Sequence, residues 1–205
     1  MTVVRYFQTT ENLQPTLITI AADKDDERLQ TIDRILRQAQ DASHAVFTTR
    51  LLAGLSEKYA LSALGPLVRV WSTPPPSDLP AAAPRVSSIK YRVEGVTLVQ
   101  PRLVRVNLTW EPTTLISDDL KISARVLDGA PVLDGARVIA AQDDWPVHNA
   151  YHTRNWRVGT AIADVYDVRL PRDTPAQSYR VLLIVYRAEN GAEVGRIEAG
   201  MVTVR

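Results

Sequence analysis

The chemically richest stretch of the 205-residue chain runs from Asp143 to Trp156. It contains two aspartates, two of the three histidines and two of the four tryptophans. Side chains of these types can ligate a metal ion, transfer a proton or stack against a sugar ring. This stretch is therefore the first candidate for a functional site.

One interpretation of this stretch is a metal site. His148 and His152 are four residues apart, which places two imidazoles on one face of a helix, and Asp144 or Asp143 would supply an oxygen ligand. However, Pro146 and two asparagines favour a loop in which polar side chains cap and hydrogen-bond the backbone. The loop is the favoured interpretation, and we predict no cofactor.

The same stretch also fits a sugar-binding platform. It combines aromatic rings, whose flat apolar faces can serve a binding site, with polar neighbours. The favoured alternative is that the two tryptophans cover one end of a hydrophobic core. The candidate ligand-binding residues are Trp145, Tyr151, Arg154 and Trp156, with Asp143 and His148 as polar neighbours.

Elsewhere the sequence lacks the patterns that covalent catalysis requires. No serine stands in a nucleophile-elbow pattern, and Gly54 and Gly65 belong to no phosphate-cradling loop. The chain has no cysteine, which excludes disulfides, thiolate nucleophiles and cysteine-ligated metals. Three pairs of adjacent aspartates are typical of turns and caps. The sequence therefore names no catalytic residue and favours a chain that is not an enzyme on its own.

The charge and hydropathy of the chain limit its partners. With 24 basic and 23 acidic residues, the net charge of +1 creates no large field of one sign, so nucleic acid is not an expected partner. No stretch approaches the ~20 apolar residues of a membrane helix, so the chain itself is not expected to insert into a membrane. Residues 1–8 lack a charged-then-apolar export pattern. This indicates a cytoplasmic protein or a piece of a longer one.

The first 71 residues alternate between strand and helix signals. Thr16–Ala21 and His44–Thr49 are apolar, β-branched runs typical of strands, and apolar residues recur at helical spacing from Arg28 to Ala39. Strand, helix and strand in this order predict a βαβ unit with parallel pairing and a right-handed crossover. We expect a short turn at Tyr59–Leu64 and a third strand at Leu67–Trp71.

A proline-rich stretch follows this α/β unit. Five prolines among the thirteen residues from Ser72 to Pro84 remove backbone donors and favour an extended conformation. We therefore predict a linker over residues 72–85, between a small α/β unit at 1–71 and a second domain at 86–205.

Short strands and turns fill residues 86–205. Asp128-Gly129, Asp134-Gly135 and Asn190-Gly191 are turn signals, and apolar residues alternate within several segments. The pattern predicts an antiparallel immunoglobulin-like β-sandwich, which makes the whole chain an α+β protein of two parts. The expected strands are Lys90–Val93, Gly95–Gln100, Leu103–Trp110, Leu120–Leu127, Arg137–Gln142, Ala161–Leu170, Tyr179–Arg187 and Gly195–Val204.

Three stretches carry a family resemblance. They are Arg5-Tyr-Phe-Gln with Asn12-Leu-Gln-Pro-Thr-Leu, then Phe47 to Trp71, and then Asp144 to Gly191, with its Asp-Val-Tyr-Asp-Val-Arg-Leu-Pro run. Together they resemble the extramembrane C-terminal region of large bacterial membrane proteins of the Chloroflexus type. Those proteins are glycosyltransferase-like and related to the protein O-mannosyltransferases.

The resemblance implies a non-catalytic accessory domain. Catalytic acids of that family lie in loops between membrane helices, which this chain lacks, so no catalytic residue carries over. The family's soluble part begins with a strand before the Arg5–Gln8 helix, so we expect a piece of a longer protein or the product of a split gene. The domain would lie on the extracytoplasmic face of the membrane and position an acceptor or partner, namely a membrane-embedded glycosyltransferase module or a glycan.

Two alternatives to this function remain open. One is a glycan-binding sandwich that uses the aromatic stretch. The other is a metal-dependent enzyme that uses His148 and His152. A chain without such a membrane parent would be cytoplasmic.

Overall fold

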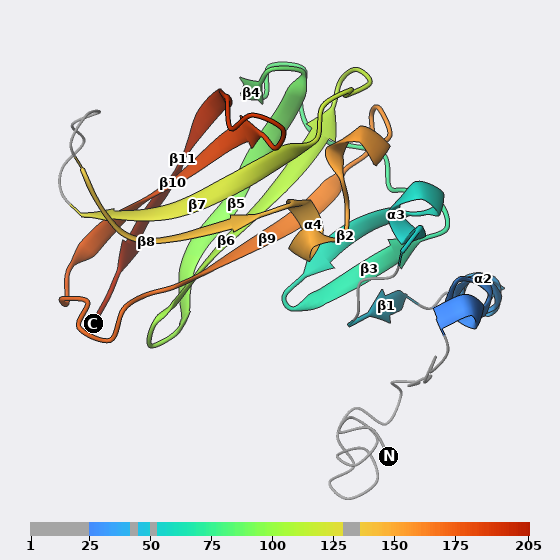
Figure 1. Cartoon of the computed structure of the whole chain (residues 1–205), viewed down its shortest axis with the longest axis horizontal. Coiled ribbons are helices and arrows are strands. Elements are labelled where there is room, and N and C mark those ends of the chain that lie inside the picture. The colour runs from blue at the N-terminus through green and yellow to red at the C-terminus, as the bar shows by residue number, and fades with distance from the viewer. Residues whose placement is uncertain (1–24, 42–44, 50–52, 129–135) are drawn as a thin grey trace, which may run out of the picture.

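The computed structural model describes residues 25–41, 45–49, 53–128 and 136–205. The predicted strand Thr16–Ala21 and the Asp134-Gly135 turn lie outside these residues. In the described part of the chain, no helix is long and apolar enough to cross a membrane. A large two-layered sandwich dominates the molecule, and a small sheet with one long helix lies at its side (Figure 1).

The sandwich consists of two four-stranded antiparallel sheets, which confirms this half of the predicted fold. The chain crosses between the sheets after β6, β8 and β9. In immunoglobulin-type sandwiches, strands A, B and E lie in one sheet and strands C, F and G lie in the other. The distribution of strands between the two sheets follows the same pattern here. One sheet runs β4 (Arg85–Val86), β5 (Ile89–Gln100), β6 (Leu103–Pro112), β9 (Ile162–Arg169), and the other runs β11 (Glu193–Thr203), β10 (Ser178–Arg187), β7 (Leu120–Asp128), β8 (Arg137–Asp144).

A tyrosine at the entrance of β10 supports the same assignment. The hydroxyl of Tyr179 donates a hydrogen bond of 2.9 Å to the backbone oxygen of Pro175, four residues upstream, and the side chain is fully buried. A tyrosine at this corner, bonded back to the preceding loop, is a hallmark of immunoglobulin-type sandwiches.

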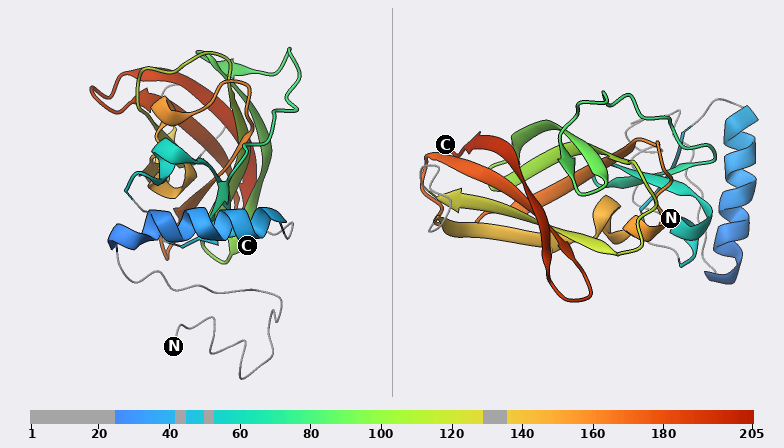
Figure 2. Two further views of the ribbon diagram at one scale, coloured as in Figure 1. Left: turned by 90° about the vertical axis from the view of Figure 1, so that its right-hand side faces the viewer. Right: turned by 90° about the horizontal axis from the view of Figure 1, so that it is seen from above.

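Alternating residues of both sheets form the core. The core lies between the two layers, whose arrangement Figure 2 shows. In a strand, every second side chain points to the same face. The inward residues of β6 and β10 are each at most 2% exposed. They are Val104, Val106, Leu108, Trp110, Val181, Leu183 and Val185.

Two strand predictions need correction. The predicted strands Lys90–Val93 and Gly95–Gln100 are one strand, because β5 is continuous from Ile89 to Gln100 and only its register shifts between Val93 and Gly95. Such a shift is a β-bulge, which glycine accommodates.

Tyr59–Leu64 is not a turn. Residues Ala60–Leu64 form strand β2, whose first four residues are buried on both faces and therefore show no alternation. Strand β4 was not predicted.

The small N-terminal sheet is antiparallel in its described part. Its order is β1 (Val46–Thr48), β3 (Leu67–Trp71) and β2. Helix α2 (Asp25–Asp41) includes the predicted helical span, and α3 (Leu55–Lys58) precedes β2. The predicted βαβ unit is not confirmed, because its first strand lies outside the described residues and the other strands pair antiparallel.

The proline-rich stretch is attached to the sandwich. Pro76 forms an isolated antiparallel bridge with Thr160, and Ser77 N donates to Gly159 O at 3.0 Å. Leu79 is 7% exposed. One continuous hydrophobic cluster contains Ile32 of α2 together with residues of β2, β3 and both sandwich sheets. Residues on either side of the predicted linker thus share a core.

Candidate functional site

The predicted site begins with a left-handed turn between β8 and β9. Within α4 (Pro146–Asn149), Val147 and His148 have φ of 55° and 54°, and φ of Asn149 is 66°. Non-glycine residues are strained in this region. Trp145 N donates to Asn149 Oδ1 at 2.8 Å, and Asn149 N donates to Trp145 O at 3.1 Å. Because the turn is not a right-handed helix, the four-residue spacing of the histidines does not place them on one face.

A buried carboxylate on β9 holds this turn. Asp164 is 1% exposed and accepts four hydrogen bonds. Oδ2 accepts from Trp110 Nε1 at 3.0 Å and from the Tyr166 hydroxyl at 2.6 Å, while Oδ1 accepts from the backbone nitrogens of Val147 at 2.8 Å and Val165 at 2.9 Å. Burial raises the pKa of the Asp164 carboxyl, and these donors oppose the rise.

Sequence reasoning missed Asp164, although a signal was present. The residue occupies an inward position of a strand whose other inward residues are Ile162, Tyr166 and Val168, each at most 1% exposed. An acidic residue at such a position must find hydrogen-bond donors. The alternation of β9 could therefore have identified a buried polar contact.

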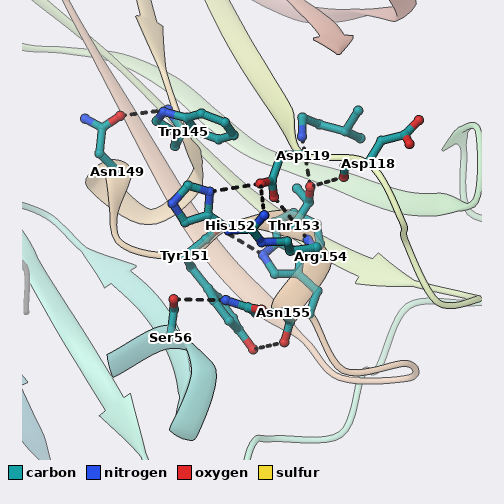
Figure 3. Close-up of polar contacts among 12 residues, drawn as sticks. Ser56, Asp118, Asp119, Trp145, Asn149, Tyr151, His152, Thr153, Arg154 and Asn155 are labelled. Carbon is teal, nitrogen blue, oxygen red and sulfur yellow. Dashed lines mark hydrogen bonds and ion pairs between the residues drawn. The ribbon is translucent and has the colours of Figure 1, made fainter. Parts of the chain in front are cut away.

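The turn and the segment that follows it are bonded to the N-terminal unit. Three of their side chains reach α3 and the β2–β3 turn, and Figure 3 shows the contact of Asn155 with Ser56. The three hydrogen bonds run from His148 Nε2 to Gly65 O (2.6 Å), from Asn155 Nδ2 to Ser56 Oγ (3.1 Å) and from Arg157 Nη2 to Lys58 O (3.1 Å).

The same segment is also bonded to the start of β7. The buried Thr153 hydroxyl donates to Asp118 O at 2.8 Å and accepts from Leu120 N at 2.9 Å. Arg154 Nη1 lies 3.3 Å from Asp119 Oδ2. Figure 3 shows these contacts around the short helix η1 (Thr153–Asn155). Residues 144–157, here named the joint segment, thus connect the sandwich to the N-terminal unit.

Two of the predicted platform residues lie inside the core. Tyr151 is fully buried and Trp156 is 3% exposed. Trp156 Nε1 donates to Tyr151 O at 3.3 Å, and its ring centroid lies 6.2 Å from that of Trp110. Burial raises the pKa of the Tyr151 phenol to about 12. Neither ring presents an exposed face in this structure, and the burial of Trp156 agrees with the favoured alternative in which a tryptophan covers the core.

Of the other two platform residues, Trp145 is half-buried and Arg154 is exposed, and both contact neighbouring side chains. The ring centroid of Trp145 lies 4.5 Å from that of His152, and Lys121 Nζ lies 5.0 Å from the Trp145 centroid. Arg154 is exposed and paired with Asp119. Trp145 therefore packs against its own neighbours.

The structure separates the predicted metal ligands. His148 bonds to Gly65, whereas Nδ1 of His152 lies 3.4 Å from Asp119 Oδ2. Asp144 accepts hydrogen bonds from Gln142 and Asn149. Among the described residues, no three histidine, aspartate or glutamate side chains are grouped to hold a metal ion. The four-residue spacing would bring the two imidazoles together only in a right-handed helix, and the left-handed turn agrees with the favoured loop interpretation.

These features define an antiparallel β-sandwich module with an attached N-terminal unit. No family model and no curated protein matches the chain. Among solved structures, it is similar to a domain of the outer membrane lipoprotein Omp28 from Porphyromonas gingivalis, with 10% identity over 65% of this chain and 98% of that one and a TM-score of 0.35. It is also similar to a Niemann-Pick type C2 protein from Japanese carpenter ant, with 9% identity over 57% and 89% and a TM-score of 0.35.

Proposed function

We propose that this chain is a non-catalytic accessory module that positions an acceptor or partner beside a membrane-embedded glycosyltransferase-like protein. It works on the extracytoplasmic face of the membrane. The identity of that partner rests on the sequence resemblance, and the positioning role rests on the joint segment.

The positioning role is supported by the hydrogen bonds and the ion pair that polar side chains of the joint segment form with both parts of the molecule. His148, Asn155 and Arg157 bond to the N-terminal unit, while Thr153 and Arg154 bond to residues at the start of β7. Groups with catalytic potential are thereby used to hold two parts together. A rigid body made in this way suits a spacer that sets the distance and angle between two attached partners.

The test is a transfer assay in proteoliposomes. The membrane glycosyltransferase-like protein encoded with this chain would be supplied with a lipid-linked sugar and a protein acceptor, with and without the chain. We expect no transfer by the chain alone and faster transfer when it is added to the membrane protein.

A variant of the joint segment gives the specific readout. Asn155→Ala with Arg157→Ala removes two bonds to the N-terminal unit and should abolish the acceleration, whereas Arg172→Gln, an exposed change at the far end of the sandwich, should retain it. Transfer by the isolated chain, or a rate that does not respond to it, would contradict the proposal.

A further inference from the structure

A pocket of about 120 Å³ opens at the loop end of the sandwich. The β4–β5 turn, the β6–β7 loop and the β10–β11 hairpin surround it. It begins beside the joint segment, at Asp118, whose carboxylate points away from His152 and Arg154 (Figure 3). None of the sequence patterns pointed to it, because its residues come from three separate regions of the chain.

An ion pair and a hydroxyl form one wall. Arg187 Nε donates to Asp118 Oδ2 at 2.8 Å, and the Ser117 hydroxyl donates to Asp118 Oδ1 at 3.2 Å. Both charged side chains are nearly half exposed, at 47% and 46%. The wall thus presents donors and acceptors close together, with no net charge.

Two further hydroxyls come from the β4–β5 turn. Ser87 and Ser88 line the pocket, and within the described residues neither hydroxyl has a hydrogen-bond partner. The turn is anchored because Thr113 donates to Ser88 O through its backbone nitrogen at 2.8 Å and its hydroxyl at 2.7 Å. Ser87 has φ of 53°, where glycine would be less strained. Retaining a side chain there is unfavourable unless the hydroxyl has a use.

Apolar side chains also line the pocket. Ile89, Ile116, Leu120 and Val194 line it, and Leu115 stands at the rim with 84% of its surface exposed. The lining of the pocket therefore combines polar and aliphatic side chains.

The lining selects a ligand class by elimination. Because Asp118 and Arg187 neutralise one another, neither an anion nor a cation is favoured. A single carboxylate cannot hold a metal, and the absence of an aromatic ring among the lining residues disfavours a nucleobase. At about 120 Å³ the pocket is smaller than the ~150 Å³ cavity that encloses a benzene ring, so part of a six-membered ring would enter it and the rest would stay in solvent.

A sugar ring meets all of these conditions. Its hydroxyls both donate and accept, as the serines and the ion pair require, and its C–H face suits an aliphatic surface. We propose that this pocket binds one neutral sugar ring, either as a free monosaccharide or as the terminal residue of a glycan. The proposal does not depend on the accessory role proposed above.

The test is a titration of the full chain followed by amide chemical shifts. Glucose, mannose, galactose and N-acetylglucosamine would be added in turn, each also as its methyl glycoside and in a disaccharide. We expect saturable shifts for at least one sugar at residues 87–89, 115–118, 187 and 194. Equal affinity for a free sugar and its disaccharide would indicate a monosaccharide ligand, and tighter binding of the disaccharide would indicate a glycan terminus.

Two variants separate binding from folding. Ser87→Gly should keep the fold, because glycine suits the φ of this position, yet it removes a hydroxyl. Arg187→Gln should weaken binding about tenfold, as expected for loss of a hydrogen bond to a charged group. Arg172→Gln is the control at the far end. No saturable shift with any sugar, shifts centred on Trp145, or unchanged affinity in both variants would overturn the proposal.

Discussion

At the scale of single residues, Asp164 links the sandwich core to the strained turn. Its four donors come from β6, from β9 itself and from the turn at Val147. A buried carboxylate with this many partners is costly to alter, because each donor would be left unpaired in a medium without water.

Asp164→Asn keeps the shape of the side chain but replaces an acceptor by a donor. We expect a loss of about 2–4 kcal/mol in the free energy of unfolding, measured by urea denaturation. Asp143→Asn is the control, since this aspartate on β8 is exposed and its change should cost less than about 1 kcal/mol. Equal effects of the two changes would disprove a special role for Asp164.

Tyr179→Phe tests the corner at the start of β10. The change removes only the hydroxyl that bonds to Pro175 O, so we expect a loss of about 1–2 kcal/mol in unfolding free energy. Tyr186→Phe, on the same strand, is the control and should be nearly neutral. If both substitutions are neutral, the corner contributes nothing to stability.

At the scale of elements, a hydrogen bond from Ser77 to an ion-paired carboxylate of the sandwich attaches the proline-rich stretch. The Ser77 hydroxyl donates to Glu111 Oε2 at 2.6 Å, and Lys90 Nζ donates to Oε1 at 2.9 Å. Burial alone would raise the pKa of the Glu111 carboxyl, but these two donors outweigh burial and hold the pKa below its ordinary value.

This shift predicts a pH dependence. A carboxyl whose pKa is lower in the folded state stabilises the fold above its unfolded pKa and loses this contribution as pH falls through the folded pKa. Unfolding free energy should therefore fall more steeply below pH 4.5 in the natural protein than in Glu111→Gln. Urea denaturation between pH 6 and pH 3 measures this fall in unfolding free energy. Glu189→Gln, a change at an exposed residue, is the control. Parallel curves for the natural protein and Glu111→Gln would refute the attachment.

Strand β11 approaches β4 closely at Gly195. A Cβ at Gly195 would lie 3.0 Å from Val86 Cγ1, whereas one at Gly95 would meet nothing within 4 Å. Gly195→Ala should destabilise the fold by about 1–3 kcal/mol, and Gly95→Ala by much less. Adding Val86→Ala to Gly195→Ala should cost less than the sum of the two single changes. Strict additivity would show that the two positions do not touch.

The sandwich could be predicted from the sequence because its elements carry local signals. Alternation located seven of its eight strands, and turn residues such as Asn190-Gly191 placed the hairpins. Strand β2 was missed because burial on both faces removes alternation. The left-handed turn was missed because it contains no glycine and depends on Asp164, far along the chain. The pocket was missed for the same reason: residues distant in sequence form it.

At the scale of the whole molecule, one hydrophobic cluster and the joint segment connect the N-terminal unit to the sandwich. The cluster runs from Ile32 in α2 through β2 and β3 into both sheets. The proposed positioning role requires this connection, because a positioning module must hold its two parts in a fixed relation.

Native-state hydrogen exchange of the full chain tests this claim most directly. We predict that amides of β2 (Ala60–Leu64) are protected to the same free energy as those of β10, because both open only when the whole molecule unfolds. In a variant with His148→Ala, Asn155→Ala and Arg157→Ala, β2 should exchange faster while β10 keeps its protection. Rapid exchange of β2 in the natural protein, or no response to the triple variant, would show that the N-terminal unit is not held to the sandwich in this way.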